Sequence, residues 1–269
     1  MVTNMNMPNT SPLSITCFLC THPSDTRDAA KHGLPLCHLA YRIGADGRLY
    51  RNGLGISVRG GLMSLSDYGI TDDTVYSEEL LRDIKRECDL RGYDGIVCDF
   101  ERSPDKFLTY FVHEASVYFT KLGMSFYIPA AMGDSAPGAK LLISSAVTNG
   151  SCSEAYARAV ARYTPERVAL LYEPVCSDYV MTPDLGLSDS ITKTQLSEIM
   201  NREHAVPYYS SELCAYYFTY KDGNNNHFIL FDDENSMLKK LTTAKNCGFK
   251  EAFILYPDTE RVLSILKTL

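Results

Sequence analysis

The sequence predicts an α/β protein, specifically a single (β/α)8 barrel of the TIM type. Short apolar runs alternate with amphipathic segments about eight times, which is the pattern of such a barrel. No linker, internal repeat or low-complexity block divides the 269 residues, 45% of which are hydrophobic. We therefore expect one barrel domain over residues 1–269, with 1–13 as a flexible N-terminal segment. A doubly wound open sheet is the alternative architecture.

The strands are predicted from short apolar runs that turn residues bound. These runs cover residues 14–20, 36–43, 54–58, 93–100, 124–130, 141–147, 168–172, 205–209 and 252–256. Nine runs are one more than a barrel needs. Either 124–130 or 141–147 is expected to be the fifth barrel strand, and the sequence leaves that choice open.

The helices are predicted from apolar spacing of three and four residues and from their end signals. The clearest runs from 77 to 91, because Ser77 can cap its N-terminus and Gly92 can end it. The expected helices cover residues 77–91, 104–121, 153–163, 192–202 and 236–246, with a short one at the C-terminus.

Composition excludes several function classes. The net charge is −7 and the isoelectric point is about 5.4, which disfavours nucleic acid and anionic membrane surfaces as partners. No stretch approaches the roughly 18 apolar residues of a membrane span, and the first residues lack the pattern of a signal peptide. Nine scattered cysteines fit reduced thiols. These features predict a cytoplasmic protein.

The segment RGYDGIVCDFER, residues 91–102, is the most informative. Alternate residues of a strand share a face, so Val97, Asp99 and Glu101 point one way, and Ile96, Cys98 and Phe100 the other. The apolar second set suits the helix-covered outside of a barrel. The first set then faces the lumen, with both carboxylates at the C-terminal mouth, where barrel enzymes carry their chemistry.

Two carboxyl groups at this spacing, about 6–7 Å apart at Cα, raise each other's pKa. One can stay protonated as a general acid while the other is charged. The alternative is structural: Arg102 and nearby lysines neutralise a solvated pair at the start of a loop.

The segment resembles the fourth-strand signature of glycoside hydrolase family 18, Asp-Gly-x-Asp-x-Asp-x-Glu. Asp94, Asp99 and Glu101 match it, whereas Val97 replaces the second acid. Weaker similarities follow: residues 58–61 (VRGG) to the third-strand motif, 170–173 (LLYE) to the sixth-strand motif, and 231–256 to the last helix and strand. The short chain is most similar to the sporulation-type bacterial branch, so a spore association is a further expectation.

The resemblance implies a role for each matching residue. Glu101 would be the general acid, Asp99 would stabilise the substrate's 2-acetamido group as it attacks C1, and Tyr172 would bind that group. Among substrate-binding residues, Glu173 would line the same subsite, and Asp94, which precedes the strand, also suits a structural role. The sequence contains no Trp, so Tyr256 is the candidate platform for a sugar ring, which favours short glycans.

Two functions remain open on these residues. The first is a retaining glycosidase that acts on N-acetylglucosamine-containing glycans, either peptidoglycan or chitooligosaccharide fragments. The second is a weak or inactive barrel that binds a glycan or a protein. Val97 leaves Asp99 without its usual acidic partner, so Asp99 is expected to rest more readily as the anion.

No metal or cofactor is expected. Cys17 and Cys20, near His22, Cys37 and His38, suggest zinc, but the two lie within one apolar strand, where positions three apart face opposite sides. The glycines at 53, 55, 60 and 61 do not form a dinucleotide fingerprint, since the third would have to stand at Val58. A carbohydrate substrate or ligand is the predicted partner, and a protein partner belongs to the second function.

Overall fold

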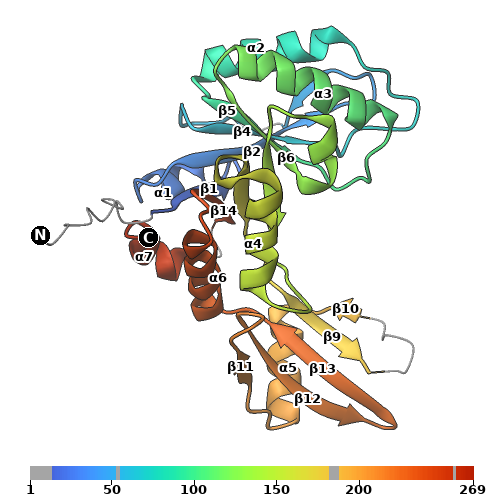
Figure 1. The fold of residues 1–269 in the computed structure, drawn as a ribbon, viewed down its shortest axis with the longest axis vertical. Coiled ribbons are helices and arrows are strands. Elements are labelled where there is room, and N and C mark those ends of the chain that lie inside the picture. Colours follow the sequence, from blue (N-terminus) through green and yellow to red (C-terminus); the bar gives the residue numbers. More distant parts are fainter. Residues whose placement is uncertain (1–13, 53–54, 182–187, 257–258) are drawn as a thin grey trace, which may run out of the picture.

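The computed structural model describes residues 14–52, 55–181, 188–256 and 259–269, and these form a closed barrel and a second, smaller sheet (Figure 1). The barrel has eight parallel strands, and its first strand pairs with both the second and the last. In order around the barrel they are β1 (Thr16–Thr21), β2 (Leu36–Ile43), β4 (Leu62–Ser66), β5 (Gly95–Asp99), β6 (Ser125–Pro129), β7 (Lys140–Ser144), β8 (Val168–Leu171) and β14 (Glu251–Leu255). The predicted (β/α)8 barrel is confirmed.

Helices follow most barrel strands and cover the outside. They are α1 (Thr26–Ala30), α2 (Glu78–Arg91), α3 (Lys106–Lys121), α4 (Cys152–Tyr163), α6 (Glu234–Asn246) and α7 (Leu263–Leu266). After the second barrel strand, β3 (Leu49–Arg51) folds back antiparallel to β2 instead. After the fifth, the 3-10 helix η1 (Ala130–Ser135) is the connection. Two further 3-10 turns, η2 (Pro165–Arg167) and η3 (Glu260–Val262), precede β8 and α7.

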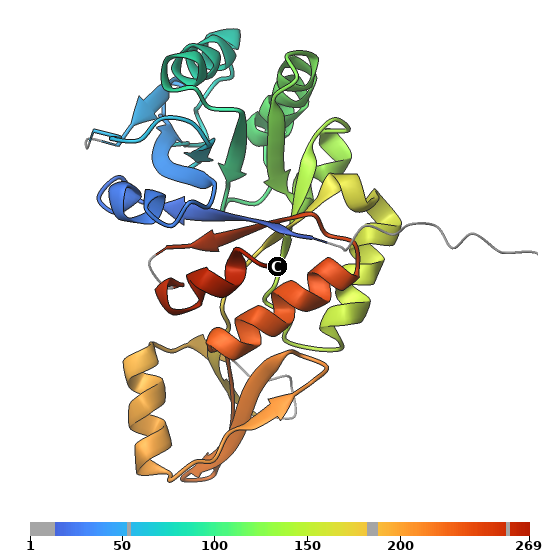
Figure 2. The ribbon, with the colours of Figure 1, turned by 90° about the vertical axis from the view of Figure 1, so that its left-hand side faces the viewer.

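An insertion between β8 and α6 forms the second sheet. Its five strands pair antiparallel in the order β10 (Ser188–Ser190), β9 (Cys176–Val180), β13 (Asn225–Phe231), β12 (Ala215–Asp222) and β11 (Tyr208–Ser210). Helix α5 (Lys193–Arg202) covers one face, where Leu196 and Ile199 pack against Phe218 and Ile229. Figure 2 shows this unit beside the barrel, on the far side of α6.

The barrel buries apolar side chains on both faces of its wall. The lumen cluster draws on all eight strands: Cys20, Cys37, Leu62, Val97, Tyr127, Leu142, Ala169 and Phe253. Outside, one large cluster lies under α2 and α3 and another under α4, α6 and α7. Burial on both faces explains why the strands read as nearly continuous apolar runs.

Several element predictions need correction. Both 125–129 and 140–144 are barrel strands, the fifth and the sixth, because a short 3-10 turn joins them. The predicted strand 54–58 falls partly outside the described residues, and 55–58 is not a strand; the third barrel strand is β4. The predicted strand 205–209 corresponds to β11, which belongs to the insertion.

The remaining expectations concern the chain end and membranes. The segment 1–13, expected to be flexible, lies outside the described residues. Within the described ranges, no helix combines the length and apolar character that a membrane crossing requires.

Candidate functional site

Strand β5 presents its side chains as the alternation predicts. Val97 is buried in the lumen cluster, whereas Ile96, Cys98 and Phe100 belong to the outer cluster under α2 and α3. Asp99 ends the strand and is reached by solvent, and Glu101 is exposed two residues later. Both acids therefore lie at the C-terminal mouth of the barrel, where parallel strands present functional groups.

Asp99 lies among charged groups from four barrel strands. The pKa of Asp99 is raised, and desolvation of its carboxyl group by the surrounding protein is the largest cause. The negative charges of Glu101, Asp67 and Glu173 raise it further. His22, which follows β1, opposes them. From the sequence we expect Asp99 to rest more readily as the anion than it would beside an acid at position 97, and this stays a prediction. The three neighbouring acids act in the opposite sense, because each raises the pKa of Asp99.

Asp67 holds the backbone that carries Glu101. It follows β4, its side chain is buried, and its two carboxylate oxygens accept the backbone N–H groups of Glu101 at 3.3 Å and Arg102 at 2.9 Å. In the alternative, structural interpretation of the sequence, Arg102 and nearby lysines neutralise Asp99 and Glu101. The Arg102 guanidinium instead bonds Asp72 and Asp105.

Ser145 fixes Glu173 in the same way. This buried serine follows β7, and its hydroxyl donates to the Glu173 carbonyl at 3.1 Å and accepts from the Glu173 N–H at 3.0 Å. Glu173 follows β8 and is exposed. Neighbouring strands therefore fix both backbone segments that carry acids to the mouth.

Three predicted site residues lie elsewhere. Tyr172 directly follows β8 and packs against the outer cluster with Val168 and Leu170, whereas Leu171 packs against the lumen cluster. Tyr256 is 2% exposed in that outer cluster, with its ring beside His32, and cannot lie flat under a sugar. Asp94 is exposed before β5, at the opposite end of the barrel from Asp99.

Two motif assignments are also corrected. Residues 170–173 end the seventh barrel strand rather than the sixth, because 125–129 and 140–144 both precede it in the barrel. Residues 58–61 precede the third strand and line a cavity at the N-terminal end of the barrel with Asp94. The residues that do reach the mouth after that strand are Ser66, Asp67 and Tyr68.

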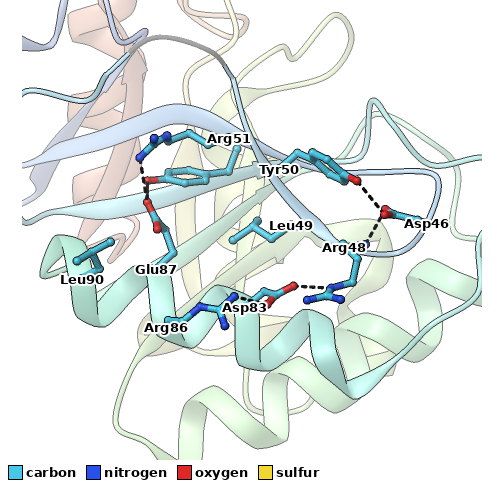
Figure 3. Close-up of a pocket in the computed structure, with 10 residues that line it drawn as sticks. Asp46, Arg48, Leu49, Tyr50, Arg51, Asp83, Arg86, Glu87 and Leu90 are labelled. Carbon is cyan, nitrogen blue, oxygen red and sulfur yellow. Dashed lines mark hydrogen bonds and ion pairs between the residues drawn. The ribbon is translucent and has the colours of Figure 1, made fainter.

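A separate pocket lies on the outside of the barrel, between the β2–β3 hairpin and α2 (Figure 3). Arg48 and Arg86 both bond Asp83 at 2.6 Å, and Glu87 contacts Arg51 at 3.7 Å. Its charges thus neutralise one another. Among the described residues, no group of three or more His, Cys, Asp or Glu side chains could hold a metal ion.

Known structures share this fold. A chitinase from Chromobacterium violaceum ATCC 12472 is 15% identical, with a TM-score of 0.66, and the match covers 94% of this chain and 98% of that one. The spore cortex-lytic enzyme SleL from Bacillus megaterium QM B1551 is also 15% identical, with a TM-score of 0.60 over 94% of this chain and 75% of that one. A mutant GH18 chitinase from Cycas revoluta in complex with (GlcNAc)4 is 12% identical, with a TM-score of 0.59 over 94% and 98%.

The structural neighbours are thus GH18 chitinases and spore cortex-lytic enzymes, and the resemblance seen in the sequence is confirmed at the level of the fold. No family model matches the sequence, and no curated protein matches it.

Proposed function

We propose that this chain is a glycoside hydrolase that cleaves N-acetylglucosamine-containing glycans, such as peptidoglycan or chitooligosaccharide fragments, with retention of configuration. One observation carries the proposal: Asp99, with its raised pKa, and the exposed Glu101 lie together at the C-terminal mouth of the barrel. The neighbouring structures are chitinases and a spore cortex-lytic enzyme, which supports this substrate class.

Glu101 serves as the general acid. Its exposed side chain can reach a glycosidic oxygen, and Asp67 fixes its backbone, so the proton is delivered from a defined position. The substrate's 2-acetamido oxygen attacks C1 as the leaving group departs, and a cyclic oxazolinium ion forms. Glu101 is then an anion, ready to accept a proton from the incoming water.

Asp99 stabilises that intermediate. Its carboxyl group accepts the acetamido N–H, and the positive charge that develops there favours the Asp99 anion at the moment when it is needed. In the free protein the surrounding acids raise the pKa of Asp99. Glu173 adds negative potential on the opposite side of the mouth, which also favours a cationic transition state.

Tyr68 is the aromatic platform that we propose in place of Tyr256. It directly follows Asp67 at the mouth, and its side chain is 87% exposed. An exposed ring beside the acids offers a flat apolar face to a pyranose and a hydroxyl for hydrogen bonding. A single ring suits a short glycan, and Tyr68→Ala should raise KM more than it lowers kcat.

The test compares purified variants on an N-acetylchitooligosaccharide and on a peptidoglycan fragment. Glu101→Gln keeps shape but cannot donate the proton, so turnover should fall at least about 10²-fold with little change in binding. Asp94→Asn is the matched control, because it removes an exposed acid of the same segment at the far end of the barrel. Equal rates for wild type and Glu101→Gln would refute the assignment.

A glycan-binding barrel without turnover is the second candidate, and Val97 favours it. Val97 is 4% exposed and packs among apolar and thiol groups below Asp99, where the family pattern has an acid. Val97→Asp should raise turnover or shift its pH optimum if the site is catalytic, although an added buried carboxyl has its own cost. Glycan binding without turnover in wild type and in Val97→Asp would favour the binding protein.

A further inference from the structure

Two thiols meet where the barrel contacts the insertion. Cys152 is the first residue of α4, and Cys214 ends the turn between β11 and β12. The Cys152 thiol donates to the Leu213 carbonyl at 3.0 Å, and its N–H donates to the Glu212 carbonyl at 2.8 Å. The Cys214 thiol donates to the Ser211 carbonyl at 3.6 Å, so both thiols bond carbonyl groups of this turn. The turn is thus held against the start of α4.

The surroundings of Cys214 are polar for a buried thiol. Its sulfur lies 3.7 Å from the Thr243 hydroxyl. The Thr243 and Tyr209 hydroxyl groups and the charge of Lys240 all lower the pKa of Cys214. Lys240 is fully buried and bonds Asp232 at 2.6 Å. The neighbouring Cys152 thiol is the largest cause that lowers the pKa of Cys214, and Cys214 in turn raises the pKa of Cys152.

Cys20 and Cys37, which pair across β1 and β2, are also neighbouring thiols, but there the contact raises the pKa of Cys37. Burial is the largest cause that raises the pKa of Cys17, Cys88 and Cys98. Cys214 alone among the cysteines has a positive φ, 50°, a conformation that is strained for a residue with a side chain and persists only where the surroundings enforce it. Cys214 is 6% exposed and Cys152 is inaccessible, so a small oxidant reaches Cys214 first.

We propose that Cys152 and Cys214 form a peroxide-reactive dithiol that closes to an intrachain disulfide. Each of the nine cysteines is a free thiol in this structure, so the described state is the reduced one. The proposal does not depend on the function proposed for the barrel mouth.

The chemistry needs hydrogen peroxide as the oxidant. The Cys214 sulfur attacks one peroxide oxygen, the O–O bond breaks, and a sulfenic acid forms while the other oxygen leaves with the thiol proton as water. The Cys152 sulfur then attacks the Cys214 sulfur, the S–O bond breaks, and the hydroxyl leaves with the Cys152 proton as a second water. The two sulfurs lose two electrons, and the peroxide gains them.

The disulfide would tie α4 of the barrel to the β11–β12 turn of the insertion and close a loop of about 60 residues. It would form beside the Asp232–Lys240 pair, where the chain returns from the insertion to the barrel.

The test treats the folded full-length chain with equimolar hydrogen peroxide, then denatures, alkylates and digests it without reductant for mass spectrometry. The peptide that links Cys152 to Cys214 should be the most abundant disulfide-linked peptide. Cys176 and Cys247, which are more exposed, should stay reduced and therefore be found alkylated. In Cys152→Ser, Cys214 should stop at a sulfenic acid that a 1,3-diketone traps. In Cys214→Ser, Cys152 should stay reduced.

Cys247→Ser is the matched control and should leave the linked peptide unchanged. The proposal fails if no linked peptide forms in wild type, if Cys176 or Cys247 oxidises first, or if Cys152 oxidises as fast in Cys214→Ser. The wild-type measurement decides even if a variant does not fold.

Discussion

The substitution Asp67→Asn tests whether this carboxylate holds the Glu101 segment. Asp67 is 4% exposed and accepts two backbone N–H groups, at 3.3 and 2.9 Å. An asparagine keeps one acceptor oxygen and places an NH2 donor against the other N–H. One charge-assisted bond is lost, which costs about 1.5–3 kcal/mol. Relief of repulsion with Asp99 offsets part of this, so we expect a net loss of about 1–2 kcal/mol.

Urea unfolding followed by circular dichroism measures this loss, and a thermal scan should show a midpoint lower by about 2–4 °C per kcal/mol. Asp72→Asn is the control, because Asp72 is on the same loop but its side chain is 96% exposed. Solvent screens its ion pair with Arg102, so its loss should change the free energy of unfolding little. If Asp67→Asn unfolds at the same urea concentration as Asp72→Asn, Asp67 does not support the segment.

Two further predictions concern buried charge. Lys240→Met removes the ion-pair partner of the buried Asp232 side chain and should lower the free energy of unfolding in urea by about 3–5 kcal/mol. The double variant Lys240→Met/Asp232→Leu should recover part of that loss. A double variant whose loss equals the sum of the two single losses would contradict this. Asp99→Asn should raise the thermal midpoint at pH 7, because the raised folded-state pKa makes the Asp99 anion cost stability as pH rises through it. That gain should vanish as pH falls below the ordinary aspartate pKa of about 3.9, and a pH-independent gain would contradict the linkage.

The sequence predicts those features best that depend on the residues of a single strand or helix. The alternation of Ile96 and Val97 placed each on the correct face, and cap residues such as Ser77 and Gly92 bounded α2 correctly. Strand β4 lacks such a signal, since its serines interrupt the apolar run. The insertion did offer one signal: Gly223 and Asn224 form a two-residue turn between the aromatic strands β12 and β13, a common hairpin pattern.

The site itself was only partly predictable. Asp99 ends β5 and Glu101 follows two residues later, so their spacing in the sequence already predicts that they lie close together. Asp67, Ser145 and His22 come from other strands, and only closure of the barrel brings them to the mouth. Alternation along β8 could have assigned Tyr172 to the outer face with Leu170, because residues two apart share a face.

The anomeric configuration of the first product tests the central claim most directly. Wild-type protein is mixed with an N-acetylchitooligosaccharide in an NMR tube, and the anomeric signal is followed before mutarotation. Substrate assistance at Asp99 and Glu101 predicts that the new reducing end keeps the β configuration of the cleaved bond, and that Asp99→Asn slows this reaction. A first product of inverted configuration, or an unchanged rate in Asp99→Asn, would contradict the mechanism.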